Sequence, residues 1–77
     1  MDSRDSKSHL QEILQKKGLP LPTYQLMDHG PKYIDDRFVS TCSSNDLAIS
    51  AMGKGKTKKI AEQEAAKLLL EEHFKNE

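Results

Sequence analysis

This sequence lacks several features that catalysis, membrane insertion or covalent bridging would need. Cys42 is the one cysteine, which excludes an internal disulfide and a cysteine-based zinc cluster and indicates a reducing, cytoplasmic setting. No apolar run approaches the roughly 18 residues of a membrane span, and the amino terminus lacks a secretory signal, so no membrane partner is expected. With 12 basic residues against 12 acidic ones, the chain is not a polycation that coats any nucleic acid. Its 77 residues suffice for one small core and leave no room for an ordinary catalytic cleft.

An amphipathic helix is predicted over residues 5–17. Its apolar residues recur at the spacing of one helix face: Leu10, Ile13 and Leu14. Asp5 or Ser8 stands where an amino-terminal cap is needed, and Gly18 stands where the helix should end.

Three strands are predicted in the middle of the chain. Two prolines forbid continuation of the helix and lead into a first strand over about residues 23–27. Turn-forming and polar residues over 28–36 predict a loop longer than a tight hairpin, and an alternating run begins at Phe38. Residues 43–45 should break this second strand, and the apolar run 47–52 is suited to a third. The expected inner face holds Phe38, Ser40 and Cys42, with Val39 and Thr41 opposite.

A second helix of about four turns is predicted after Thr57, its expected N-cap. Its apolar stripe consists of Ala61, Ala65, Leu68 and Leu69. The predicted fold class is therefore α+β: an α-β-β-β-α two-layer sandwich, with a three-stranded antiparallel sheet and both helices on one face. Residues 1–4 are interpreted as a disordered tail or linker remnant, and residues 5–75 as one domain.

The most informative string is GKGKTKKIAEQEAA, over residues 53–66. Unpaired N–H groups and a partial positive charge make a helix amino terminus a phosphate site, and lysines strengthen it. Lys58 and Lys59 in the first turn oppose the helix dipole, at a cost of up to about 1 kcal/mol, which suggests that an anion sits there. The plainer alternative is a solvated lysine patch with glycines that serve only as a turn. A nucleotide-binding loop is excluded, because Ser50 stands where its first glycine is required.

A polar stripe lies opposite the apolar face of the first helix: Ser8, Gln11, Glu12 and Gln15. Mostly uncharged donors and acceptors suit ribose hydroxyls and base edges in the shallow minor groove of A-form RNA. An ordinary solvent face is the competing interpretation.

Other residues that could bind a metal or act in catalysis have no second ligand or catalytic group at a suitable spacing in the sequence. His9 and His29 have no ligand at metal spacing, so no metal site is expected. The adjacent loop carboxylates Asp35 and Asp36 are interpreted as solvated, and Cys42 is expected to pack in the core.

Taken together, SHLQEILQKKGLPLPTY, the Gly-Pro loop, RFVSTC and GKGKTKKIAEQEAA resemble a double-stranded RNA-binding domain over nearly the whole chain. DSKSHLQEILQ and AEQEAA are similar, more narrowly, to the carboxy-terminal domain of bacterial ribonuclease III. In this family the first helix and the loop between strands one and two enter successive minor grooves, the second helix start spans the major groove, and the contact extends over about 16 base pairs.

The resemblance implies specific RNA-binding residues. The minor-groove helix positions are Ser8, Gln11, Glu12 and Gln15, and the loop positions are Gly30 and Pro31. The phosphate-contacting positions are Lys56, Lys58 and Lys59, with Lys54 and Thr57 in the same string. The family often has histidine soon after Gly-Pro, where this chain has Tyr33 in a loop one residue longer; the Tyr33 hydroxyl, or His29 before the pair, is expected to make that contact. Glu62 stands where many members have lysine and ribonuclease III domains often have glutamate.

The resemblance further implies a non-enzymatic fragment. Ribonuclease III cuts RNA with an acidic, magnesium-binding domain, and no signature of that kind occurs here. We expect no cofactor in this domain, magnesium in the absent nuclease domain, a monomeric isolated domain and a homodimeric parent enzyme that processes double-stranded RNA.

Two alternatives come from other classes. Some domains of this fold have lost RNA binding and pair with proteins; such a domain should expose apolar residues on the first helix, and it has no need of a basic first turn. A DNA-binding domain is disfavoured, because no recognition helix offers arginine or asparagine to base edges.

Overall fold

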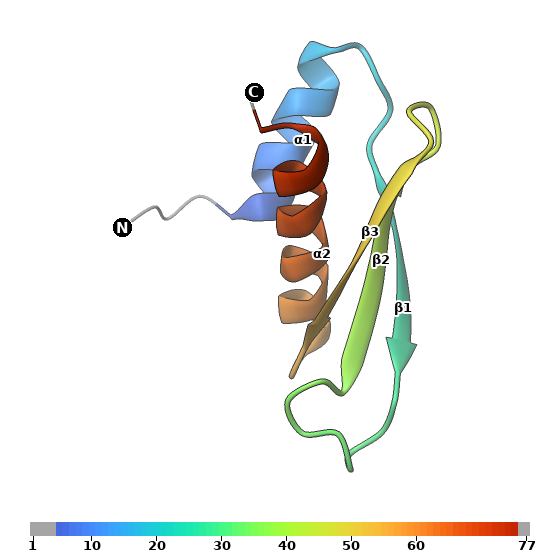
Figure 1. The fold of residues 1–77 in the computed structure, drawn as a ribbon, viewed down its shortest axis with the longest axis vertical. Coiled ribbons are helices and arrows are strands. Elements are labelled where there is room, and N and C mark those ends of the chain that lie inside the picture. The colour runs from blue at the N-terminus through green and yellow to red at the C-terminus, as the bar shows by residue number, and fades with distance from the viewer. Residues whose placement is uncertain (1–4, 76–77) are drawn as a thin grey trace.

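The fold has two helices around three strands, in the predicted order (Figure 1). The computed structural model describes residues 5–75, so the predicted tail of residues 1–4 lies outside it. The elements are α1 (Ser6–Lys16), β1 (Thr23–Asp28), β2 (Phe38–Ser44), β3 (Ile49–Gly55) and α2 (Lys58–His73).

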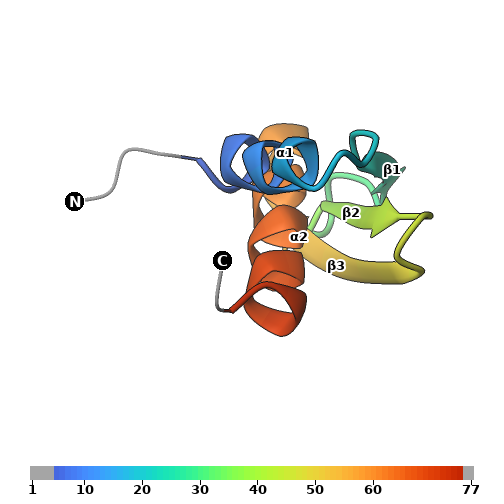
Figure 2. The ribbon, with the colours of Figure 1, turned by 90° about the horizontal axis from the view of Figure 1, so that it is seen from above.

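The strands form one antiparallel sheet in the order β1-β2-β3. Both helices lie on the same side of this sheet, which confirms the predicted two-layer sandwich (Figure 2). Helix α2 packs across the strands, whereas α1 packs chiefly against α2. Neither of these helices has the length and apolarity needed to cross a membrane.

Helix α1 is closed at both ends by local hydrogen bonds. Asp5 is the N-cap, and its carboxylate accepts from the Ser8 N–H at 2.7 Å. At the other end Gly18 adopts a left-handed conformation with φ 72°, and its N–H donates to the carbonyl of Gln15. The Leu19 N–H donates to the carbonyl of Leu14, which completes a Schellman motif. The expected start and stop signals are therefore confirmed, with Asp5 rather than Ser8 as the cap.

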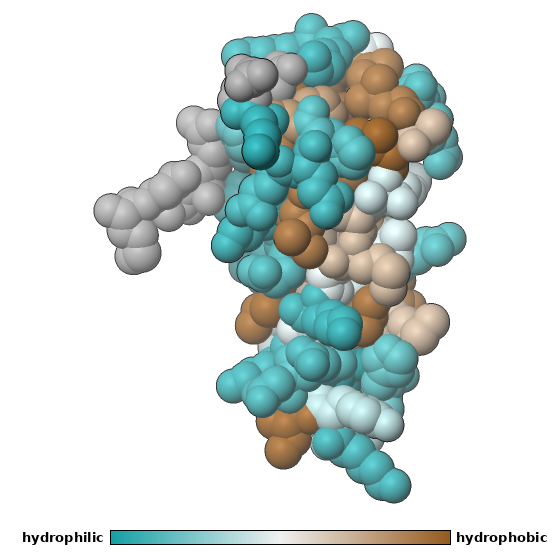
Figure 3. Space-filling view, in the orientation of Figure 1, coloured by the Kyte–Doolittle hydropathy of each residue, from teal (hydrophilic) through white to brown (hydrophobic). Residues whose placement is uncertain are grey.

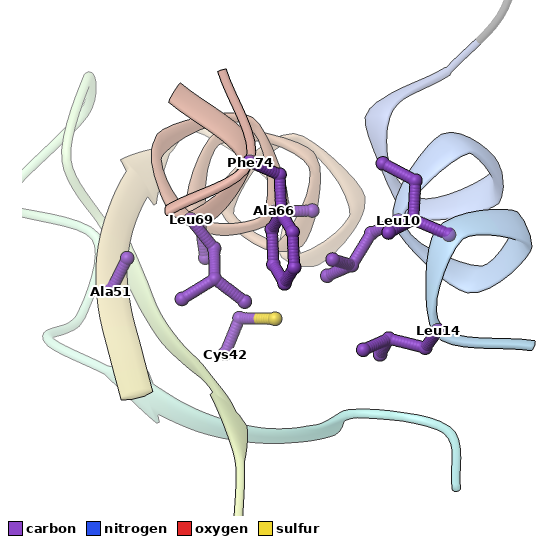
Figure 4. Close-up of a cluster of buried hydrophobic side chains, with 9 residues drawn as sticks. Leu10, Leu14, Cys42, Ala51, Ala66, Leu69 and Phe74 are labelled. Carbon is purple, nitrogen blue, oxygen red and sulfur yellow. The ribbon is translucent and has the colours of Figure 1, made fainter. Parts of the chain in front are cut away.

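The core lies between the helices and the inner face of the sheet (Figure 4). Leu10 and Leu14 of α1 point toward Phe74 and Ala66, while Cys42 contributes its thiol from β2. Burial raises the pKa of the Cys42 thiol, so it is a packing group rather than a nucleophile. The fully buried residues of α2 are Ala61, Ala65, Ala66 and Leu69. Of the predicted stripe, Leu68 is only half-buried, and Ala66 takes its place in the core.

The predicted bounds of the second and third strands were wrong. Ser43 and Ser44 belong to β2 instead of breaking it, because both pair with β3. The third strand begins at Ile49 rather than at 47, because residues 45–48 form a turn in which Ala48 has φ 55°. It also runs on through Gly53 to Gly55, so these glycines are not a turn.

Gly53 and Gly55 are the points where α2 approaches the sheet most closely. A Cβ at Gly53 would lie 2.2 Å from the backbone nitrogen of Ala65, and one at Gly55 would lie 2.8 Å from the backbone nitrogen of Ala61. Ser40 pairs with Gly53 on the inner face and is fully buried, with no hydrogen-bond partner for its hydroxyl within the described residues. Small residues are required here because helix and sheet nearly touch. This close packing fixes the position of the α2 amino terminus.

Candidate nucleic-acid interface

The start of α2 gathers the basic residues. Lys58 and Lys59 are its first two residues, and no acidic residue lies in its first turn. Thr57 is the N-cap, as predicted, and its hydroxyl oxygen accepts from the Ile60 N–H at 3.1 Å. Lys56, Lys58 and Lys59 are all exposed. Exposed lysines at a helix amino terminus without acidic residues are suited to binding an anion.

The amino terminus of α1 lies on one side of this basic turn. The ammonium group of Lys7 contacts the Glu62 carboxylate at 2.6 Å, and the Lys7 N–H donates to the Gln63 side chain at 3.1 Å. Hydrogen bonds from Ser8 lower the pKa of Asp5, and the nearby charge of Lys59 lowers it further. Glu62 thus ties the two helices together.

The polar stripe of α1 begins beside this junction. Ser8, Gln11, Glu12 and Gln15 are exposed, whereas Leu10, Ile13 and Leu14 are buried. Gln11 lies with Lys7 and Tyr24 around a small hollow at the α1–β1 junction. Burial of one face therefore leaves the stripe accessible along the helix.

The β1–β2 loop (residues 29–37) lies on the other side of the basic turn. Lys56 and Asp35 form an exposed ion pair at 3.7 Å. The hydrogen bond from Arg37 lowers the pKa of Asp28, at the end of β1, and the nearby charge of Lys58 lowers it further. Figure 3 shows hydrophilic residues over most of this lower end of the molecule. The start of α2 therefore lies between the other two predicted regions, α1 and the loop.

The structure separates Lys54 from the other lysines. Gly53 and Gly55 face α2, so Lys54 faces the opposite, open side of the sheet. There it lines a hollow together with His29, Tyr33 and Val39. Lys54 accordingly belongs with the loop residues and not with the α2 cluster.

His29 and Tyr33 meet in this loop, with their ring centroids 5.9 Å apart in an edge-to-face arrangement. Gly30 lies between them with φ 95°, and the Tyr33 N–H donates to its carbonyl at 3.2 Å. Pro31 is exposed at the loop surface. The residues that follow β1 therefore share one turn, in which both aromatic rings are accessible.

Sequence reasoning missed the ion pairs that position these elements. Lys7–Glu62 and Asp28–Arg37 join residues far apart in the chain or at the two ends of a loop, so periodicity carries no sign of them. Within residues 5–75, no group of three or more potential ligand side chains could hold a metal ion.

The comparison with known families decides the affiliation of the chain. Residues 6–73 match the family described as "Double-stranded RNA binding motif". The chain belongs to this family. Two solved structures that resemble the domain are also of double-stranded RNA-binding domains. It superposes on the second double-stranded RNA-binding domain of DRB4 with a TM-score of 0.64 and 38% identity, covering 92% of this chain and 96% of that one. The structure of both DRB4 domains with their linker gives a TM-score of 0.67 and 35% identity, over 92% of this chain and 45% of that one.

Curated relatives of the domain are named Ribonuclease 3. The protein of Thiobacillus denitrificans is 42% identical over 64 residues, which cover 83% of this chain and 28% of the relative. That of Francisella philomiragia is 43% identical over 68 residues, which cover 88% of this chain and 30% of the relative. The chain thus spans less than a third of these proteins. It is a double-stranded RNA-binding domain related to ribonuclease III, which confirms the resemblance inferred from its motifs.

Proposed function

We propose that this domain binds duplex RNA through α1, the β1–β2 loop and the start of α2, and that it delivers substrate to a ribonuclease III. The α1 stripe and the loop contact two minor grooves, and Lys56, Lys58 and Lys59 contact the phosphates between them. In this proposal Thr57 donates its hydroxyl proton to a phosphate, and Lys54 supports the loop contact.

The observation that carries the proposal is that α1 and the β1–β2 loop both meet the basic first turn of α2. The Lys7–Glu62 pair joins α1 to α2 beside this turn, and the exposed pair Lys56–Asp35 shows that the loop lies next to it. A shape-reading domain needs its contacts at fixed separations, because A-form RNA offers little sequence code in its accessible groove. A basic first turn without any acidic residue has no folding benefit, since it opposes the helix dipole.

The surface of α1 favours RNA over a protein partner. All large apolar side chains exposed among residues 5–75 lie outside α1. A helix that docked a protein would be expected to present an apolar patch. A mostly uncharged polar stripe suits ribose hydroxyls instead.

The name of the relatives, Ribonuclease 3, supports a proposal about the wider role. In the proposed parent enzyme, a dimeric nuclease domain with magnesium cleaves the RNA in the cytoplasm, and this domain supplies affinity and placement. The domain itself, monomeric when isolated, performs no chemistry.

The test is a fluorescence anisotropy titration against an RNA duplex of about 20 base pairs, a DNA duplex of equal length and single-stranded RNA. Selective binding to duplex RNA is expected, with a shallow salt dependence set by a few phosphates. Equal binding to all three would reduce the site to a charged patch, and no binding to any would favour a protein partner.

A further inference from the structure

The β1–β2 loop has no hydrophobic anchor of its own. Residues 29–36 are exposed or nearly so, and none is buried. A loop of this kind samples many conformations, and fixing one upon binding costs affinity. Some other feature must hold it if it is to meet a groove at a set distance from α1.

The carboxylate of Asp28 performs this task through three hydrogen bonds. Arg37 donates to it from two nitrogens, with Nε to Oδ1 at 2.9 Å and a terminal nitrogen to Oδ2 at 3.1 Å. The Gly30 N–H donates to Oδ1 at 2.8 Å. Asp28 ends β1 and Arg37 precedes β2, so this forked ion pair closes the neck of the loop.

The pair is itself held in place from both sides. The His29 N–H donates to the Arg37 carbonyl at 2.7 Å, and the guanidinium lies over the ring of the buried Phe38, 5.0 Å from its centroid. The hydrogen bond from Gly30 to Asp28 also links the ion pair to the middle of the loop, because the Gly30 carbonyl accepts from the Tyr33 N–H at 3.2 Å. A continuous path therefore runs from Asp28 to the aromatic residue at the tip.

We infer that Asp28 and Arg37 are positioning residues, which preset the β1–β2 loop so that Tyr33 and its neighbours meet the second minor groove of an RNA duplex. The inference rests on the proposed function and adds to it the pair that sets the spacing. Neither residue contacts RNA in this account. Exposed ion pairs add little to folding stability, so the pair acts on binding and its variants fold.

The experiment compares two RNA duplexes, one of about 20 base pairs that accommodates both minor-groove elements and one of about 10 that is shorter than their combined span of roughly 16. Affinities are measured by anisotropy for the wild type, Asp28→Asn and Arg37→Lys, with thermal unfolding of each protein. Arg37→Lys keeps the charge but loses the fork. Asp36→Asn is the matched control, because it removes a carboxylate from the same loop without altering the pair.

Both variants are expected to weaken binding to the long duplex roughly fivefold and to leave the short duplex within about twofold. A pure charge effect predicts the opposite for Asp28→Asn, since loss of a negative charge favours RNA; Asp36→Asn reports that effect alone. Unchanged affinity for the long duplex, or equal weakening on both duplexes, would overturn the inference. A wild-type domain that binds neither duplex would overturn the proposed function itself. The wild-type measurement therefore distinguishes a failure of the proposed function from a failure of this inference.

Discussion

Helix α1 and the β1–β2 loop are proposed to perform the same task at two minor grooves, yet they are held by different forces. The helix is fixed by burial, since Leu10 and Leu14 are fully inaccessible to solvent. The loop is fixed by the exposed pair Asp28–Arg37 and by hydrogen bonds. Burial couples a contact surface to the stability of the whole domain, whereas an exposed pair can order a contact surface almost independently of it.

The largest expected effect is on folding stability, when a buried contact of α1 is removed. Leu14→Ala leaves a cavity beneath α1 and should lower the free energy of unfolding by about 2–5 kcal/mol, measured by urea denaturation. Tyr33→Ala in the loop is the control and should change stability by less than about 0.5 kcal/mol. Similar losses for both would mean that the loop, too, is part of the cooperative core.

The second prediction concerns the basic turn between the two elements. Lys58→Ala combined with Lys59→Ala should weaken duplex RNA binding more than about tenfold, because charge-assisted phosphate contacts are lost. Stability should stay equal or rise by a few tenths of a kcal/mol, since these lysines oppose the dipole. Lys67→Ala, on the same helix but away from its start, is the matched control for charge. Unchanged affinity in the double variant would remove the proposed phosphate site.

A smaller effect is expected on RNA affinity when one side chain is removed from either minor-groove element. Gln11→Ala on α1 and Tyr33→Ala in the loop should each cost about threefold in affinity for duplex RNA, the worth of one hydrogen bond. Gln25→Ala, on the open face of the sheet, serves as the control in the same titration. A large loss for one element and none for the other would show that a single minor groove is read.

The smallest effect is the acid response of the loop. Hydrogen bonds from Arg37 and Gly30 lower the pKa of Asp28 from 3.8 to about 2. Because the pKa of Asp28 is lower in the folded state than in the unfolded state, the ionised carboxylate stabilises the folded loop fully above about pH 4. This stabilisation is lost as the pH falls toward about 2. NMR titration of the Gly30 amide should therefore show a midpoint near 2 and no change between pH 5 and 8. Arg37→Ala should move that midpoint up toward 3.8; an unmoved midpoint would mean that Arg37 is not the cause.

Local signals were enough to predict the helices. The buried stripe of α1, its Asp5 cap and its end at Gly18 are all written in residues three to five apart. The Thr57 cap of α2 was equally visible. The extent of the third strand depends on tertiary packing and could not be predicted from the local sequence pattern. The third strand continues through Gly53 because α2 lies directly against it, and a glycine in isolation reads as a turn.

The candidate site was predictable as a list of residues but not as an arrangement. The lysines and the polar stripe follow from composition and spacing, whereas the placement of Lys54 on the far side of the sheet follows from strand alternation past the predicted strand end. The two positioning ion pairs depend on distances between elements, which no local pattern encodes.

The near contact at Gly53 has a consequence for how this domain tolerates mutation. Since even one methyl group there would collide with the α2 backbone, a selection for RNA binding would score Gly53 as harshly as Lys58. The two positions would nevertheless fail for unlike reasons, one by displacing the helix and the other by removing a charge. Only a parallel measure of protein abundance would separate them, and without it a mutational map of this domain would place part of its RNA-binding surface in its interior.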